Sequence, residues 1–196
     1  LPADSAGRIS YRAFTKLWEE AEAADWIAVG PGLGRSWGLS RLVSRLYSEL
    51  PKPLVVDADG LNALASGEGK LPPAKGPRIL TPHPGEFRRL VGPDADPRRP
   101  LQERWRLAQR CARAWDVVLV YKGHPTLVTD GTRHFYNPTG NPGMATGGSG
   151  DVLTGLIAAL GAQGLDAFSA AQLGVYLHGL AGDLGAQDLG EESLIA

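Results

Sequence analysis

The stretch NPGMATGGSGDVLTGLIAAL, residues 141–160, changes character at its midpoint. Glycines at positions 143, 147, 148 and 150 come just before Asp151, and the segment that follows is almost entirely apolar. This pattern predicts a buried helix over residues 151–160 that is entered through a flexible loop. The first turn of a helix has unpaired N–H groups and carries about half a positive charge, which attracts anions. Because glycines have no side chain, they would let a phosphate approach these N–H groups closely.

Asp151 stands at the start of that helix, and its position allows two interpretations. Its carboxylate could take a proton from a hydroxyl that attacks a phosphoryl group held beside it. Alternatively, the segment is a Gly-rich turn in which Asp151 is only the N-cap of the helix. These residues alone leave both interpretations open.

The rest of the chain alternates short apolar runs with longer amphipathic stretches. We predict strands over residues 25–29, 53–56, 78–80 and 117–120, and helices over residues 36–49, 101–114, 151–160 and 167–186. Such alternation is typical of an α/β fold with a mainly parallel sheet and helices on both faces. Residues 126–129 and 133–136, separated by Asp130 and Gly131, predict a β-hairpin, so some antiparallel strands come late in the sheet. We expect a single domain over residues 1–196.

Composition narrows the function classes. The chain has 196 residues, 43% of them hydrophobic, a net charge of −1 and one cysteine, Cys111. The low net charge argues against a nucleic-acid partner or an anionic membrane surface, and arginines between residues 98 and 106 alternate with acids, which predicts a solvated face. No apolar run approaches a membrane span, the first residues have no signal-peptide pattern, and a lone cysteine fits a reducing cytoplasm.

Polar and glycine-rich clusters follow four of the predicted strands. They read GPGLG at residues 30–34, DADGLN at 57–62, TPHPGE at 81–86 and KGHPT at 122–126. Because ligands of such sheets bind beyond the carboxyl ends of the parallel strands, we expect these clusters to meet at one binding edge.

Several residues in these clusters have a structural alternative to ligand contact. His83 lies between two prolines and could contact a ligand or simply form a turn, and Glu86 is better explained as a helix cap than as a magnesium ligand. Asp57 and Asp59 could hold a metal, orient a substrate hydroxyl or form Asx turns. Lys122 could reach a phosphate or be an ordinary surface lysine.

Familiar catalytic motifs are missing from the sequence. The sequence contains no P-loop. Its G-x-G-x-x-G fingerprint is incomplete, because position 37, where the third glycine would stand after Gly32 and Gly34, is tryptophan. The absence of H-E-x-x-H argues against a zinc enzyme, and the absence of G-x-S-x-G argues against a serine hydrolase.

Taken in order, the four clusters and the block at residues 141–153 resemble the ADP/ATP-dependent NAD(P)H-hydrate dehydratases of the ribokinase-like superfamily. The resemblance covers nearly the whole chain, and its most specific parts are TPHPGE and NPGMATGGSGDVL. It implies a three-layer ribokinase-like fold. It also implies an N-terminal and a C-terminal truncation, because the family domain usually begins with strands and a helix rich in Gly and Ala.

The resemblance implies a hydro-lyase that repairs NADH or NADPH to which water has been added. Asp151 would take the proton of the C6 hydroxyl of the (6S)-hydrate, and that oxygen would attack the terminal phosphoryl group of ADP, or of ATP, with Mg²⁺ absorbing charge. Elimination of phosphate would then give NAD(P)H, AMP and phosphate.

The same resemblance assigns the site residues. Besides the catalytic Asp151, the residues expected to bind the hydrate are Gly34, His83, Asn141 and Asp151. Those expected to bind the nucleotide are Lys122, Gly123, His124, Pro125, Thr126, Gly147, Gly148, Ser149 and Gly150. No residue is assigned as a direct metal ligand, and Asp57, Asp59 and Asn62 are expected nearby.

The expected partners are NADHX or NADPHX and an adenine nucleotide, with no nucleic acid or membrane. The resemblance further implies a cytoplasmic homotetramer and an NAD(P)HX epimerase that is fused or separate. The main alternative is a ribokinase-like small-molecule kinase acting on a hydroxymethylpyrimidine or thiazole alcohol, which would share residues 147–151. A non-catalytic nucleotide-binding module is a further alternative.

Overall fold

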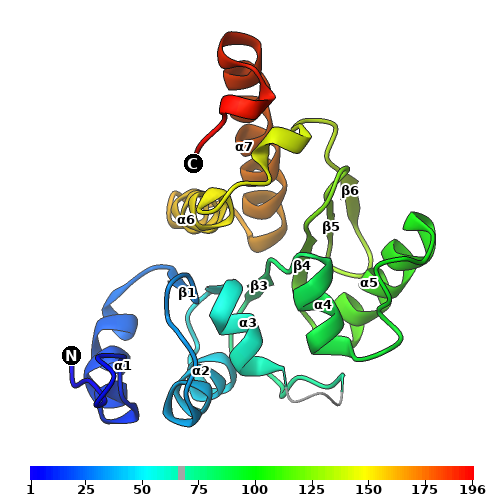
Figure 1. Cartoon of the computed structure of the whole chain (residues 1–196). Coiled ribbons are helices and arrows are strands. Elements are labelled where there is room, and N and C mark those ends of the chain that lie inside the picture. Colours follow the sequence, from blue (N-terminus) through cyan, green and yellow to red (C-terminus); the bar gives the residue numbers. More distant parts are fainter. Residues whose placement is uncertain (66–68) are drawn as a thin grey trace.

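A six-stranded sheet forms the centre of the computed structural model, which describes residues 1–65 and 69–196. Its strands lie in chain order (Figure 1): β1 (Ile27–Val29), β2 (Leu54–Val56), β3 (Arg78–Leu80), β4 (Val118–Tyr121), β5 (Leu127–Thr129) and β6 (His134–Tyr136). The first four strands are parallel, and β4, β5 and β6 pair antiparallel. The predicted parallel sheet and the late hairpin are therefore confirmed.

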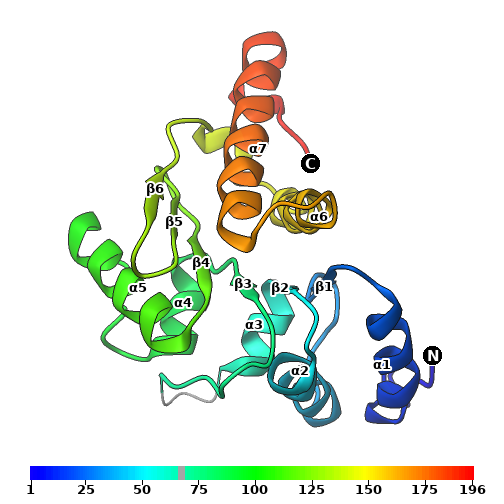
Figure 2. The same ribbon diagram turned by 180° about the vertical axis from the view of Figure 1, so that it is seen from behind.

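Helices cover both faces of this sheet, which gives three layers (Figures 1 and 2). One face carries α2 (Trp37–Glu49), α3 (Ala58–Leu64), α4 (Pro84–Val91) and α5 (Leu101–Trp115), with α1 (Phe14–Ala23) beyond the β1 edge. The other carries α6 (Ser149–Ala162) and α7 (Ala167–Leu189). Short 3-10 helices lie at Tyr11–Ala13, Pro142–Met144 and Glu191–Ser193. In the described ranges, no helix has both the length and the apolar character needed to cross a membrane.

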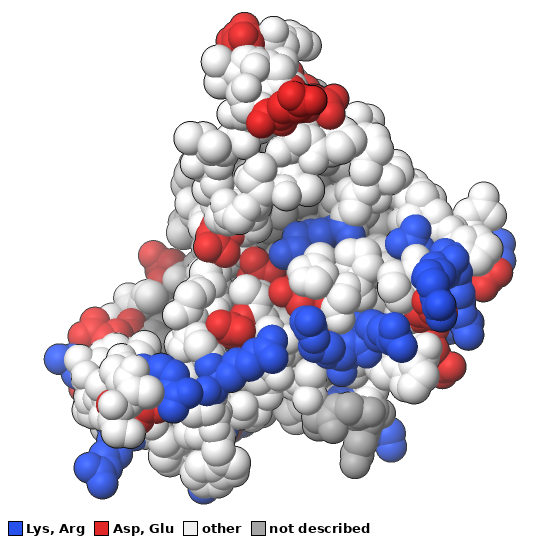
Figure 3. Space-filling view, viewed as in Figure 1, with Lys and Arg blue, Asp and Glu red and all other residues white. Residues whose placement is uncertain are grey.

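The strands bury both faces because successive side chains point to opposite sides of a sheet. Leu54, Val56 and Leu80 face the core under α2 to α5, whereas Val55 and Ile79 face the core under α6 and α7. Strand β2 is apolar and buried at every position, as expected for a strand in a sheet with two covered faces. On the outside, Lys and Arg side chains form a band with Asp and Glu beside it (Figure 3).

The predicted helices all exist, with small shifts at their ends. Ser36 caps α2 by accepting a hydrogen bond from the Leu39 amide, and α6 begins at Ser149, two residues earlier than predicted. The sequence pattern did not predict α1 or α3. The seven residues of α3 include Gly60 and Asn62, both weak helix formers, so this short helix depends on tertiary contacts with α2 and α4 and on the burial of Leu61 and Leu64.

A buried arginine fixes helix α2 to strand β3. Arg78 is 1% exposed, and its guanidinium donates hydrogen bonds to the carbonyl oxygens of Tyr47 (2.7 Å), Lys52 (2.9 Å), Pro77 (2.9 Å) and Leu50. Burial lowers the pKa of Arg78 to about 10, so the group stays charged at neutral pH. The cation thus satisfies carbonyl groups at the C-terminal end of α2, where a positive charge is favourable.

Replacing this side chain should destabilise the fold. Arg78→Met keeps an apolar stem but leaves buried carbonyl groups without donors, so we expect the free energy of unfolding to fall by about 3 kcal/mol. Urea denaturation followed by circular dichroism measures this. The matched control is Arg12→Met, on an exposed arginine, which should change little. Equal stability of the two variants would contradict the role given to Arg78.

Candidate active site at the carboxyl edge of the sheet

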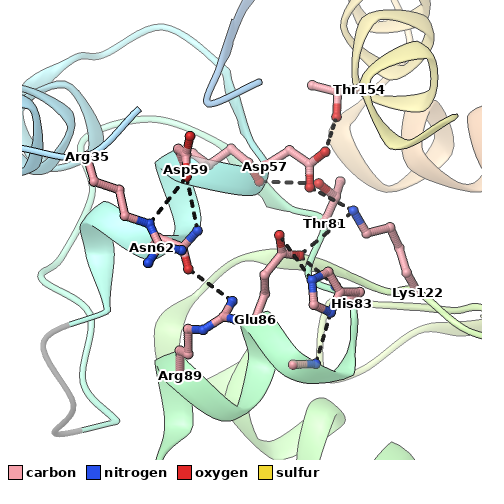
Figure 4. A network of polar contacts seen from close by, with 12 residues as sticks. Arg35, Asp57, Asp59, Asn62, Thr81, His83, Glu86, Arg89, Lys122 and Thr154 are labelled. Carbon is pink, nitrogen blue, oxygen red and sulfur yellow. Dashed lines mark hydrogen bonds and ion pairs between the residues drawn. The ribbon is translucent and has the colours of Figure 1, made fainter. Parts of the chain in front are cut away.

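A buried ion pair lies where strands β2 and β4 end (Figure 4). The Lys122 Nζ atom is 2.8 Å from Asp57 Oδ1, and the Asp57 side chain is only 2% exposed. Thr154 on α6 donates a hydrogen bond of 3.0 Å to the other oxygen of the same carboxylate. Lys122 is therefore not an ordinary surface lysine, and Asp57 does not form an Asx turn, since its side chain makes no capping bond to α3.

His83 and Glu86 form a capping box at the start of α4. The His83 amide donates to Glu86 Oε2 at 2.9 Å, and the Gly85 amide donates to His83 Nδ1 at 3.0 Å. This confirms that Glu86 is a helix cap and shows that His83 has a structural role. Glu86 also lies 3.9 Å from Lys122 Nζ, and the imidazole of His83 is half exposed, so the cap borders the ion pair.

A second network joins the loop after β1 to α3. Asp59 accepts hydrogen bonds from the Gly34 amide (2.9 Å) and from the Asn62 side chain (3.3 Å), and lies 3.5 Å from Arg35. Arg89 on α4 donates to Asn62 at 3.1 Å. Asp59 and Asn62, predicted as neighbours of the site, thus lie beside the ion pair (Figure 4), and Asp59 also holds Gly34, which was predicted to bind the hydrate.

The first turn of α6 presents free backbone donors. Gly148 has a positive φ of 92° and is the N-cap. Within residues 1–65 and 69–196, the amides of Gly147, Gly148, Gly150 and Asp151 donate no hydrogen bond. Asp151 lies in the first turn with an exposed side chain and is not the N-cap, so the capping alternative is wrong. Free amides at a helix N-terminus are suited to binding an anion.

A cavity of about 460 Å³ opens on one side of this turn. Its walls include six residues predicted to bind nucleotide and two predicted to bind the hydrate: Lys122, Gly123, His124, Thr126, Ser149 and Gly150, then His83 and Asn141. Pro125, Gly147 and Gly148 adjoin this lining in sequence without being part of it. We call this space the lysine cavity.

A second cavity, of about 590 Å³, lies on the other side of the same turn. Asp151 and Thr154 line it together with Gly30, Leu33 and apolar side chains that include Leu17 of α1. We call it the aspartate cavity. Gly34 lines neither cavity, although it directly follows the loop that borders this one. The start of α6 therefore separates two spaces, and Asp151 faces one of them.

Two polar residues of α7 also belong to the site, and the sequence analysis missed them. His178 lines the lysine cavity with its Nε2 atom 3.4 Å from Ser149 Oγ, and burial lowers the pKa of its imidazole, which favours the neutral form at pH 7. Asp183 accepts hydrogen bonds from the Gly140 amide (2.8 Å) and from the Asn141 side chain (3.0 Å), and these bonds lower its pKa. Their signal is their polarity within a largely apolar helix.

The described side chains do not converge into a metal site made by protein alone. No group of three His, Cys, Asp or Glu in this part of the chain could hold an ion. The Asp57 carboxylate is already bonded to Lys122 and Thr154. Mg²⁺ commonly binds through one or two carboxylates together with substrate phosphates, so the residues fit an ion that enters with a nucleotide.

Comparisons with known proteins agree with this geometry. A family described as NAD(P)H-hydrate dehydratase matches residues 8–194. The bifunctional NAD(P)H-hydrate repair enzyme of Moorella thermoacetica is 47% identical over 198 residues, which cover all of this chain and 37% of the relative. The ADP-dependent (S)-NAD(P)H-hydrate dehydratase of Neisseria meningitidis is 38% identical over 184 residues, 92% of this chain and 59% of the relative.

A solved structure shows the same architecture. The ADP/ATP-dependent NAD(P)H-hydrate dehydratase of Bacillus subtilis, co-crystallised with ATP and Mg²⁺ and soaked with CoA, superposes with a TM-score of 0.76 at 34% identity. The match covers 91% of this chain and 66% of that one, which confirms the ribokinase-like fold. The chain spans 37%, little more than a third, of the length of the first two bifunctional relatives.

The contributions of Asp57 and Lys122 to the free energy of unfolding should depend on each other. We expect Asp57→Asn to lower the free energy of unfolding by about 2 kcal/mol, because Lys122 is partly exposed and can turn toward water. Once Lys122→Met has removed the charge, Asp57→Asn should cost about 1 kcal/mol less. A double-mutant cycle in urea measures this coupling, with the exposed Glu22→Gln as control. Additive effects would mean that the two side chains do not interact.

Proposed function

The chain belongs to the NAD(P)H-hydrate dehydratase family, and from this premise we propose that it is a hydro-lyase that repairs hydrated NADH or NADPH with ADP as phosphoryl donor. The substrate is the (6S)-hydrate, and the products are NAD(P)H, AMP and phosphate. The name of the Neisseria meningitidis relative supports ADP as donor.

One observation carries the proposal. Asp151 is an exposed carboxylate in the first turn of a helix whose neighbouring amides are unpaired, and this turn separates two cavities. In phosphoryl transfer, the base has to reach the attacking hydroxyl while hydrogen-bond donors in a region of positive potential hold the transferred group. The first turn of α6 offers both within two or three residues.

The lysine cavity is the proposed nucleotide site. Lys122, Gly123, His124 and Thr126 form one wall and the start of α6 forms another, so the phosphates of ADP would point at the free amides of Gly147, Gly148 and Gly150. Ser149, held near His178, lies at the same end. Lys122 Nζ is close to this turn, since a Cβ atom added to Gly150 would lie 3.3 Å from it.

The nicotinamide ring of the hydrate, which carries the reacting hydroxyl, is proposed to bind in the aspartate cavity. Asp151 accepts the proton of the C6 hydroxyl, and the freed oxygen bonds to the terminal phosphorus of ADP while the bond to the AMP oxygen breaks. The lone pair of the ring nitrogen then expels phosphate as the C6–O bond breaks, and loss of a proton from C5 restores the dihydronicotinamide. Mg²⁺ carried by the nucleotide would supply charge neutralisation, while the α6 amides and Lys122 orient the phosphates.

Assembly and location complete the proposal. A homotetramer is supported by apolar side chains of α7 that are 38 to 53% exposed, namely Leu173, Tyr176, Leu177 and Leu184. The names of the bifunctional relatives support an epimerase that is fused to this domain or acts beside it. A cytoplasmic location fits the single, half-buried Cys111, whose pKa burial raises to about 11.

Removing the proposed base gives a direct test. In Asp151→Asn, we expect the rate of NAD(P)H recovery to fall by about 10² to 10⁴, because the amide cannot accept the proton. Nucleotide affinity should be largely retained, since the α6 amides remain. The rate is measured as the recovery of dihydronicotinamide absorbance from chemically hydrated NADH in the presence of ADP and Mg²⁺. Nucleotide affinity is measured by calorimetry with ADP.

The control variant is Asp188→Asn, on an exposed carboxylate of α7, and it should turn over normally. Equal loss of turnover and nucleotide binding in Asp151→Asn would indicate a purely structural role. Phosphorylation of a pyrimidine or thiazole alcohol without NADH recovery would support the kinase alternative, and ADP binding by an unsubstituted protein without any turnover would support a binding module.

A further inference from the structure

A third cavity lies on the other face of the sheet from α6. It has a volume of about 430 Å³ and is bounded by α4, the loop at residues 92–100 and α5. Phe87 and Tyr121 form its floor, and its charged lining residues are Asp94, Arg99, Glu103, Arg104, Arg106 and Arg110. None of these residues belongs to the site described above. We call this space the arginine cavity; Figure 3 shows Lys and Arg side chains gathered over the α5 side of the molecule.

The arginines of this cavity are not neutralised by the protein. Four arginines face two acids, and across the described part of the chain none of the four forms an ion pair. The neighbouring Arg98 differs, because it pairs with Asp96 at 2.8 Å. Arg106 and Arg110 are four residues apart on α5, a spacing at which like charges destabilise a helix. The cavity therefore has excess positive charge that an anion would relieve.

Arg104 gives an independent indication. Its Nε atom is buried and has no hydrogen-bond partner in the described structure. Arg98, Arg99 and Arg106 are exposed, as expected for a solvated face, whereas Arg104 is partly buried. Buried polar atoms nearly always have a hydrogen-bond partner, so the buried Nε atom of Arg104 is an exception that an additional acceptor would remove. The planar fork of a guanidinium matches the oxygens of a phosphate group.

We propose that the arginine cavity binds a small phosphate-bearing anion, with Arg104 as its central donor and Arg99, Arg106 and Arg110 around it. The ligand is compact, because Asp94 and Glu103 in the lining of the cavity repel an extended polyanion such as nucleic acid. This site is distinct from the proposed nucleotide site, since the two cavities share no lining residue.

Hydrogen exchange with pyrophosphate as the probe tests this proposal. We expect pyrophosphate to slow amide exchange over residues 92–110 relative to sodium chloride of equal ionic strength. Arg104→Ala/Arg110→Ala should abolish this footprint and weaken pyrophosphate binding at this site at least about tenfold in calorimetry, because hydrogen bonds to a charged group are lost. The control Arg12→Ala/Lys16→Ala removes two exposed positive charges elsewhere and should keep the footprint.

The location of the footprint separates this inference from the proposed function. Slower exchange only over residues 146–155 would overturn the arginine cavity while leaving the α6 anion site in place. No footprint at either segment, or an identical footprint in Arg104→Ala/Arg110→Ala, would also overturn it. The wild-type measurement alone decides the location, so the test holds even if the double variant folds poorly.

Discussion

The ion pair between Asp57 and Lys122 is the contact on which the geometry of the site depends. It joins the ends of β2 and β4, and through Thr154 it also fixes the first turns of α6 above them. It therefore helps to position Lys122 in the wall of the lysine cavity and the start of α6 beside it. The pair also limits Lys122 as a phosphate ligand, because part of its charge is already neutralised by Asp57. An incoming phosphate therefore depends mainly on backbone donors, with Lys122 as a shared cation.

A site built from backbone donors explains why glycine is concentrated around it. Gly30 has a positive φ of 132°, and a Cβ atom there would lie 1.8 Å from the Asp57 carbonyl oxygen, so the loop after β1 can pass this close only without a side chain. Gly148 adopts a positive φ as the N-cap of α6. A side chain at Gly150 would approach both Lys122 and Asp57. Each glycine therefore preserves either a close backbone approach or access to a free amide.

Local patterns in the sequence were sufficient to predict much of this arrangement. Apolar runs ending in polar clusters located the parallel strands, and the glycines before Asp151 located the start of α6. The sequence could not reveal contacts between residues that are distant along the chain. Thr154 lies 97 positions from its partner Asp57, and Arg78 donates to carbonyl groups 26 to 31 positions earlier. A lone threonine or arginine carries no local signal of its partner. The unpaired state of Arg104 is likewise visible only once α5 is packed against its neighbours.

The division of space by α6 has a chemical consequence for the proposed reaction. In-line phosphoryl transfer places the attacking and leaving oxygens on opposite sides of phosphorus, so the two reactants should enter from opposite directions. The start of α6 lies between two cavities, so in the proposed reaction the free amides of Gly147, Gly148 and Gly150 would meet the nucleotide and the carboxylate of Asp151 would meet the hydroxyl. Activation of the hydroxyl therefore depends on bringing it directly between that carboxylate and the electrophilic phosphorus.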